Sequence, residues 1–302
     1  MNIFSFTAHF GSEEDCRKHF KTERDKIGVV CKCGHTEHYW KQDKWSYECK
    51  KCRYRTSLRK GTIMENSNLP FLVWYKTMFL MSCTKKGFSS KEIQKQLGLK
   101  RYEPVWAMVH KLRKAMGNRD SRYTLEGMIE FDEGYFTVES SEIEQEKGIR
   151  GKGAVGKQNV AIMAESTPLE DVKTGKKEKQ VRYFKAKVLE GHKGKEINQT
   201  IKENVDNQSI VFTDKSASYV DIADFVELHI TEKSNKQVTK ETLKWVHIAI
   251  SNAKRNLLGN YHKIKRKYLQ LYLNEFIYKL NRRYFGERLF DRLIIANITT
   301  LG

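Results

Sequence analysis

The chain has 302 residues, of which 31% are charged and 39% are hydrophobic, a balance that excludes an intrinsically disordered chain. Lysine and arginine number 56 against 37 acidic residues, which gives a formal net charge of +19. This excess of basic charge favours a polyanionic partner, above all nucleic acid, over a role in solubility alone. No apolar run is long enough to span a bilayer and the N-terminus lacks the pattern of a signal peptide, so we expect a cytoplasmic protein without a membrane partner.

The first two segments of the chain differ in composition. Residues 1–27 are predicted to form an N-terminal helical segment, in which the letters SEED provide a helix-start signal. Residues 28–66 are rich in cysteine, aromatic and β-type residues. Because a cytosolic chain of this size seldom relies on disulfides, its six cysteines indicate free thiols or a metal site.

Four of the cysteines have the spacing of a structural zinc site. Cys49 and Cys52 form a C-x-x-C pair, and fifteen residues separate Cys33 from Cys49. The upstream pair is C-x-C, one residue shorter than the usual knuckle, so His35 or His38 could replace its first cysteine as a ligand. The alternative is a set of small buried thiols. The spacing favours a zinc ribbon held together largely by Zn²⁺, with the ligands Cys31, Cys33, Cys49 and Cys52.

Residues 67–120 carry the pattern of three helices. Ser89 or Ser90 is expected to cap a short middle helix that ends at Gly98, and a third helix begins at Pro104. This pattern favours a helix-turn-helix whose third helix enters the major groove of DNA, over an ordinary bundle with a solvated basic face. The third helix is predicted to expose His110 and, as DNA contacts, Lys111, Arg113 and Lys114.

Residues 121–302 contain apolar strands that run into aspartates. GMIEFDEGYFTV, NVAIMAES and KQVRYFKAKVL read as three strands, followed by the helix GKEINQTIKENV and the strand SIVFTD. This order predicts an RNase H-like α/β catalytic domain with a mixed sheet, whose first and fourth strands are parallel neighbours. Asp132 and Asp214 would then lie close together, although either alone is also typical of a cap or turn. Two adjacent carboxylates are costly without cations, which predicts a catalytic Mg²⁺ or Mn²⁺ site.

A glycine-bearing basic loop at residues 148–157 lacks the G-x-x-x-x-G-K-[ST] pattern of a phosphate-binding loop. We interpret it as a loop that contacts DNA through Lys152 and Lys157. The segments together predict a multidomain α+β protein with a zinc ribbon, a helix-turn-helix and an RNase H-like domain.

Several stretches together resemble bacterial insertion-sequence transposases. They are CKCGHTEHYW, CKKCRYRTSLRKGT, IEFDEGYF, VFTDKSASY, KWVHIAISNAKRNLLGNYH and YLQLYLNEFIYKLNRRYFGERLFDRLI. The group in question has an N-terminal zinc ribbon and a DDE-type nuclease domain, and is related to eukaryotic Merlin elements. The resemblance implies binding of double-stranded DNA at terminal inverted repeats, Mg²⁺-dependent cleavage of 3′ ends by two-metal-ion chemistry, and transfer of those ends to target DNA. It also implies a homodimer or larger assembly, a nucleoid-associated location, and Asp132 and Asp214 as the first two catalytic acids.

The third catalytic position is where the sequence departs from the resemblance. Many relatives carry Glu shortly after a Val-His pair, and the corresponding place here is Asn252, which some members of the family also have. An Asn offers a neutral carbonyl oxygen to a metal ion. His247 is the other candidate, because it lies seven residues before Lys254, two helical turns away on the same face. Glu133 and Glu275 are further carboxylates that could compensate.

Basic residues in the C-terminal part are expected to contact DNA. For the two basic residues of the helix after the Val-His pair, the alternative is a solvated helix face. For the histidine of GNYH, the alternative is packing. For Glu275, the alternative to a role at the site is an ion pair with one of the two arginines of LNRR. The residues assigned to DNA here are Lys254, Arg255, His262, Arg282 and Arg283.

Two other functions compete with the transposase interpretation. One is a non-catalytic zinc-ribbon DNA-binding protein with a decayed nuclease domain, which Asn at the third position keeps open. The other is a structure-selective nuclease that cuts branched DNA without joining ends. Metal-dependent cutting distinguishes the first of these from a transposase, and strand transfer distinguishes the second.

Overall fold

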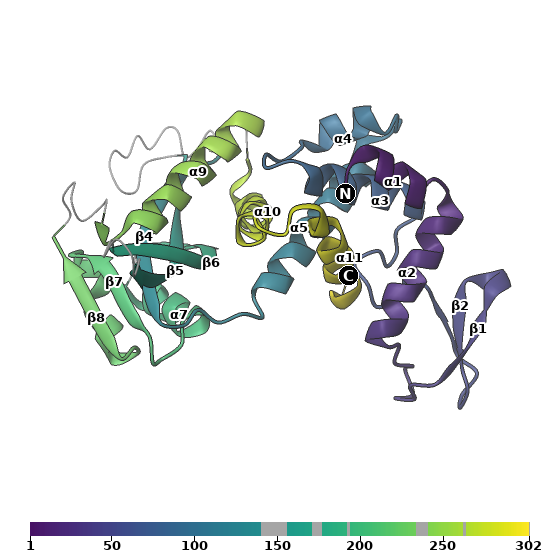
Figure 1. Cartoon of the computed structure of the whole chain (residues 1–302), viewed down its shortest axis with the longest axis horizontal. Helices are drawn as coiled ribbons and strands as arrows, with labels where there is room; N and C mark the ends of the chain where they lie inside the picture. Colours follow the sequence, from purple (N-terminus) through teal and green to yellow (C-terminus); the bar gives the residue numbers. More distant parts are fainter. Residues whose placement is uncertain (140–155, 171–176, 192–193, 234–240, 262–263, 302) are drawn as a thin grey trace. The chain divides into compact units, whose positions relative to one another are not determined.

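The computed structural model describes residues 1–139, 156–170, 177–191, 194–233, 241–261 and 264–301. The chain folds into two compact units, both drawn in Figure 1. The first contains residues 1–119 together with 282–302, and the second contains residues 120–281. None of the described helices is long and apolar enough to cross a membrane.

The N-terminal helices of the first unit are α1 (Ile3–His9) and α2 (Glu13–Ile27). Helix α2 begins at the SEED sequence as predicted, because Ser12 and Asp15 form a capping box. The buried guanidinium of Arg24 donates hydrogen bonds to the backbone carbonyls of Leu58 and Lys60. Helix α2 is thereby attached to the end of the ribbon that follows it.

The ribbon is a three-stranded antiparallel sheet with the order β1-β2-β3. Its elements are β1 (His38–Lys41), the 3-10 turn η1 (Gln42–Lys44), β2 (Ser46–Cys49) and β3 (Arg55–Ser57). Cys31 and Cys33 lie in the loop before β1, Cys49 ends β2 and Cys52 follows in the turn to β3, so the sheet brings the two cysteine pairs to one end of the ribbon.

The three predicted helices are present as α3 (Phe71–Cys83), α4 (Ser90–Gln96) and α5 (Tyr102–Asp120). Ser89 caps α4 in a second capping box with Glu92. Gly98 follows α4 with φ +61°, a left-handed conformation that glycine adopts at low cost.

The C-terminal segment belongs to the first unit. After η4 (Gly286–Arg288), helix α11 (Leu289–Thr299) packs against α2 and α3. The ring of Phe290 contacts the rings of Phe6, Phe10 and Tyr75, at centroid distances of 5.5–5.9 Å. We expected residues 282–302 to continue the catalytic domain, but their apolar side chains complete the aromatic core of the first unit.

The second unit is built on a mixed five-stranded sheet with the order β6-β5-β4-β7-β8. The strands are β4 (Met128–Thr137), β5 (Lys157–Glu170), β6 (Lys177–Val188), β7 (Ile210–Asp214) and β8 (Leu228–Glu232). β4, β5 and β6 are antiparallel neighbours, whereas β7 pairs in parallel with both β4 and β8. The predicted RNase H-like strand order, with the first and fourth strands adjacent and parallel, is therefore confirmed.

Helices cover both faces of this sheet (Figure 1). On one face, α7 (Gly194–Asn204) and the 3-10 segment η2 (Ala217–Asp224) pack with Ile129 and Phe131 of β4. On the other face, α9 (Lys244–Asn260) and α10 (Leu269–Asn281), which follows η3 (Arg266–Tyr268), pack with Phe136. Alternate residues of β4 therefore face two separate apolar clusters, and the even-numbered ones face α9.

Candidate active site and metal centre

Asp132 and Asp214 lie on neighbouring strands and face the same side of the sheet. The parallel pairing places Glu130 of β4 opposite Phe212 of β7. Asp132 and Asp214 lie two residues further along their strands, beyond the last paired residues, and the charge of Asp214 acts on the Asp132 carboxylate. Because Phe212 packs against the α9 cluster, and side chains alternate along a strand, both carboxylates point to the face that α9 covers.

The two carboxylates have the character of cation ligands. Burial, together with the negative charge of Asp214, raises the pKa of Asp132 to about 7, although the backbone N–H of Glu133 donates a 2.7 Å hydrogen bond to its Oδ1. Oδ1 of Asp214 is buried and accepts no hydrogen bond from the described residues. Buried carboxylate oxygens of this kind are costly unless a cation compensates them, and Mg²⁺ and Mn²⁺ prefer such oxygens. The donor set therefore fits the expected divalent ion.

His247 of α9 joins the aspartates. Its Nδ1 lies 3.6 Å from Oδ2 of Asp132. Burial lowers the pKa of His247, while the charge of Asp214 opposes that change. A neutral imidazole nitrogen can ligate a transition metal ion, whereas the two carboxylates supply the oxygens that Mn²⁺ prefers. Lys254, two turns along α9, lies with its Nζ 5.8 Å from the ring centre of Phe136, and its charge acts to lower the pKa of Asp132.

Asn252, the other candidate for the third position, lies on a different side of α9. It lies five positions after His247, a rotation of about 140° around an ideal helix. Its Oδ1 accepts a 2.7 Å hydrogen bond from the guanidinium of Arg255. The structure thus places His247 beside Asp132, whereas the side chain of Asn252 hydrogen-bonds to Arg255.

The two further carboxylates have protein partners. Glu133 accepts hydrogen bonds from the side-chain amide of Asn159 and from the hydroxyl of Tyr219, the latter at 3.2 Å. Glu275 forms a buried ion pair with Lys279 at 2.9 Å within α10. Both carboxylates therefore already have hydrogen-bond or ion-pair partners within the protein.

The prediction that Arg113 and His110 are exposed is wrong. The side chain of Arg113 is fully buried, and His110 is stacked on Trp106 at a centroid distance of 3.9 Å. Arg113 follows the buried Val109 by four residues, so it stays on the face of α5 that packs inward. Lys111 is half-buried and donates to the backbone carbonyl of Glu65 at 2.7 Å, which leaves Lys114 as the exposed cation of this set.

The other residues predicted to contact DNA differ in how far their side chains are exposed to solvent. Lys157 and Arg255 are exposed, and Lys254 is half-buried, all three in the second unit. Arg282 and Arg283 are half-buried and belong to the first unit. Lys152 and His262 lie outside the described residues.

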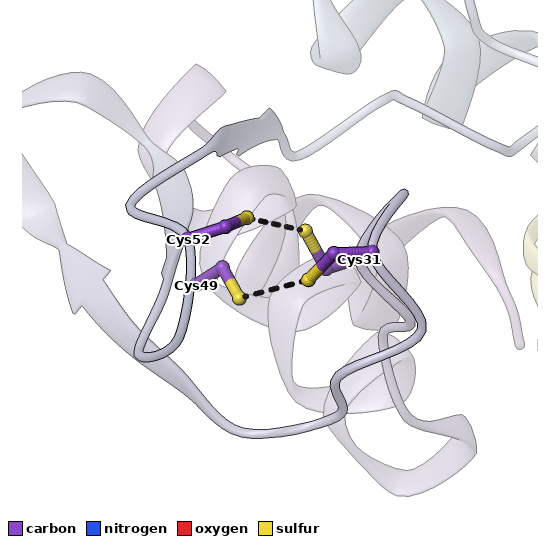
Figure 2. Close-up of side chains that lie close together, drawn as sticks. Cys31, Cys49 and Cys52 are labelled. Carbon is purple, nitrogen blue, oxygen red and sulfur yellow. Dashed lines mark hydrogen bonds between the residues drawn. The ribbon is translucent and has the colours of Figure 1, made fainter.

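The four predicted zinc ligands form one cluster. Their sulfurs all lie within 4.8 Å of one another, with 3.5 Å between Cys31 and Cys52 and 3.7 Å between Cys33 and Cys49. Figure 2 shows the side chains of Cys31, Cys49 and Cys52 turned toward a common centre. Tetrahedral Zn²⁺ with Zn–S bonds of about 2.3 Å requires sulfurs roughly 3.8 Å apart, so the cluster fits zinc without movement of the backbone.

Local backbone conformation explains how the short C-x-C pair reaches this geometry. Gly34 and Arg53, each one residue beyond a cysteine pair, have φ values of +82° and +60° and turn the chain sharply. His38 hydrogen-bonds through Nδ1 to the backbone carbonyl of Thr36 at 2.9 Å and does not belong to the cluster. Cys31, rather than a nearby histidine, is therefore the fourth member.

Glu130 and Tyr219 also lie near the candidate site, but the sequence did not predict a role for either residue. Glu130 is fully buried and binds the start of α9 through Oε2. Tyr219 is buried beside Phe131 and reaches Glu133 from the segment that follows Asp214. The only signal in the sequence was that Glu130 alternates with Asp132 along the strand.

Comparison with protein families agrees with this geometry. Residues 124–281 match the ISXO2-like transposase domain, which is more than half of the chain and nearly the whole second unit. The chain belongs to this family, and it is a transposase of the insertion-sequence type. No curated protein matches it.

Proposed function

We propose that this chain is an active DNA transposase that cuts the 3′ ends of its element and joins them to target DNA, with Asp132, Asp214 and His247 as the catalytic metal site. The observation that carries the proposal is the convergence of β4, β7 and α9, where His247 lies 3.6 Å from Asp132 on the face that also receives Asp214. Membership of the transposase family supports the reaction class.

The chemistry divides between the metal and the chain. When bound, Mg²⁺ or Mn²⁺ activates the attacking water or 3′-hydroxyl and stabilises the leaving oxygen. Asp132 and Asp214 supply anionic oxygens, and Asp132 has to lose the proton that its raised pKa favours. His247 supplies a neutral nitrogen on the same side. Lys254, on the same face of α9, is placed to contact the phosphate next to the scissile bond.

DNA recognition is assigned to basic surface residues and to the first unit. The zinc ribbon and helices α3 to α5 are proposed to bind the terminal inverted repeats, with Lys114 contacting phosphate. Lys157 and Arg255 are proposed to hold DNA near the catalytic face. These exposed cations gain affinity by releasing counterions from the DNA backbone. Joining two ends requires a dimer or larger assembly, and this work takes place on the bacterial nucleoid in the cytoplasm.

The test uses DNA that flanks the gene. Purified protein is incubated with labelled flanking DNA, a target plasmid, and Mg²⁺ or Mn²⁺. Cutting at a repeat boundary followed by joining to the plasmid is the expected result. Cutting of branched DNA without joining would instead identify a structure-selective nuclease. Binding without metal-dependent cutting would identify a DNA-binding protein with a decayed nuclease domain.

A further inference from the structure

Glu130 connects strand β4 to the start of helix α9. Its carboxylate is fully buried, and Oε2 accepts hydrogen bonds from the backbone N–H groups of Trp245 at 2.7 Å and Val246 at 3.1 Å. The opening N–H groups of a helix have no partner within the helix, and its dipole favours a negative charge at this end. One side chain of the strand therefore binds the first turn of the helix.

The next two residues of β4 on this face also contact α9, in the same order along both elements. Asp132 faces His247, at 3.6 Å. Gly134 lies beneath Ile250, where a Cβ on the glycine would come within 3.2 Å of Cγ2 of that side chain. The helix thus rests directly on the strand, and a displacement of its first turn would move His247 away from Asp132.

Burying a carboxylate costs free energy that an apolar side chain of the same size would not. Its desolvation is unfavourable unless hydrogen bonds compensate it, and an apolar side chain would suit the neighbouring cluster at lower cost. We propose that Glu130 is a positioning residue, which fixes the first turn of α9 on β4 and thereby holds His247 against Asp132. The catalytic consequence rests on the proposed function, whereas the hold on the helix does not.

Two substitutions of Glu130 separate its hydrogen bonds from its volume. Glu130→Met keeps a side chain of similar size but removes the acceptor for both N–H groups. Glu130→Gln keeps one side-chain oxygen that can accept both bonds. The matched control is Glu165→Met, because Glu165 is also buried, accepts from the Tyr123 hydroxyl at 2.8 Å, and faces the α7 side of the sheet.

The full-length variants are compared by amide hydrogen exchange in α9, by Mn²⁺ affinity and by cleavage of bound DNA. For Glu130→Met we expect exchange in the first turn to rise at least about tenfold, and Mn²⁺ affinity and cleavage to fall about 10–100-fold, the usual effect of losing a group that orients a metal ligand. DNA affinity should stay at the wild-type level. Glu130→Gln should restore most of the loss, and Glu165→Met should spare α9 and Mn²⁺ binding.

Three outcomes would overturn the inference. They are unchanged exchange in α9 of Glu130→Met, faster exchange with unchanged Mn²⁺ affinity, and an equal loss of Mn²⁺ affinity in Glu165→Met. If the wild-type protein neither binds Mn²⁺ nor cuts DNA, the proposed function fails. Exchange in α9 then still decides whether Glu130 holds the helix.

Discussion

Nδ1 of His247 lies 3.6 Å from Oδ2 of Asp132, and the two side chains reach this position from α9 and β4. The parallel pairing of β4 with β7 brings Asp214 to the same face. Three segments far apart in the sequence therefore meet at one group of side chains that we propose as metal ligands. On this basis we propose His247 as the third member of the site, whereas Asn252 hydrogen-bonds to Arg255.

Substitution of the two candidates for the third position should have opposite results. His247→Ala is expected to reduce metal-dependent cleavage at least about 100-fold, because it removes a ligand worth several kcal/mol in the transition state. Asn252→Ala should stay within about threefold of wild type, since it removes only a surface contact with Arg255. Cleavage rates at saturating DNA give the comparison, and a larger loss in Asn252→Ala would reassign the third position.

Metal-free protein should lose stability as pH rises, through Asp132. Its pKa is about 7 in the folded protein against an ordinary value of 3.8, so the folded state holds a proton that the unfolded chain has released. The free energy of unfolding therefore falls between about pH 4 and pH 7, by on the order of 2–4 kcal/mol. Asp132→Asn should be more stable than wild type at pH 7.5, with a difference that shrinks toward pH 4. Thermal unfolding without added Mg²⁺ or Mn²⁺, with the zinc of the ribbon retained, measures this, and no gain at pH 7.5 would contradict it.

The neighbouring positions of Asp132 and Asp214 could be predicted because strand order has few solutions. Three antiparallel strands, a helix and a further strand place the fourth strand beside the first, and alternation then fixes which side chains share a face. The third member of the site could not be chosen in this way. The rotation of α9 about its axis depends on what lies beneath it, namely Glu130, Gly134 and their contacts with the helix.

The cysteine cluster was likewise predictable from the sequence only in part. Spacing was enough to predict a metal ribbon, but the choice between Cys31 and a nearby histidine depended on the backbone turn at Gly34. Arg113 was misjudged because its charge suggested a surface position, whereas its phase on α5 places it in the core. Residues 282–302 were assigned to the wrong unit because their apolar pattern suits either one.

Zinc should be bound by the ribbon alone and should support DNA binding. Cys52→Ser removes one of four thiolates and is expected to lower zinc content well below one ion per chain and to weaken binding to the element ends. Cys83→Ser is the control, because that exposed thiol lies outside the cluster. Metal analysis and DNA titration are the measurements. Equal zinc in both variants would remove Cys52 from the site.

Substitutions of two basic residues of α5 should have different effects, one on stability and the other on DNA binding. Arg113→Ala is expected to lower the free energy of unfolding by about 2–4 kcal/mol, since it empties a fully buried position. Lys114→Ala should leave stability within about 0.5 kcal/mol but weaken DNA binding, and should reduce the salt dependence of affinity by about one phosphate contact. Urea unfolding and DNA titrations at several salt concentrations test the pair. Unchanged stability in Arg113→Ala would contradict its buried role.

The central claim is that Asp132, Asp214 and His247 form one metal site. Anomalous X-ray scattering from crystals grown with Mn²⁺ locates the ion and its ligands directly. We expect a Mn²⁺ peak within ligand distance, about 2.0–2.3 Å, of oxygens of Asp132 and Asp214 and a nitrogen of His247. The peak should disappear in Asp214→Asn crystals under the same conditions. A peak that is liganded by Asn252, or that lies away from both aspartates, would contradict the account.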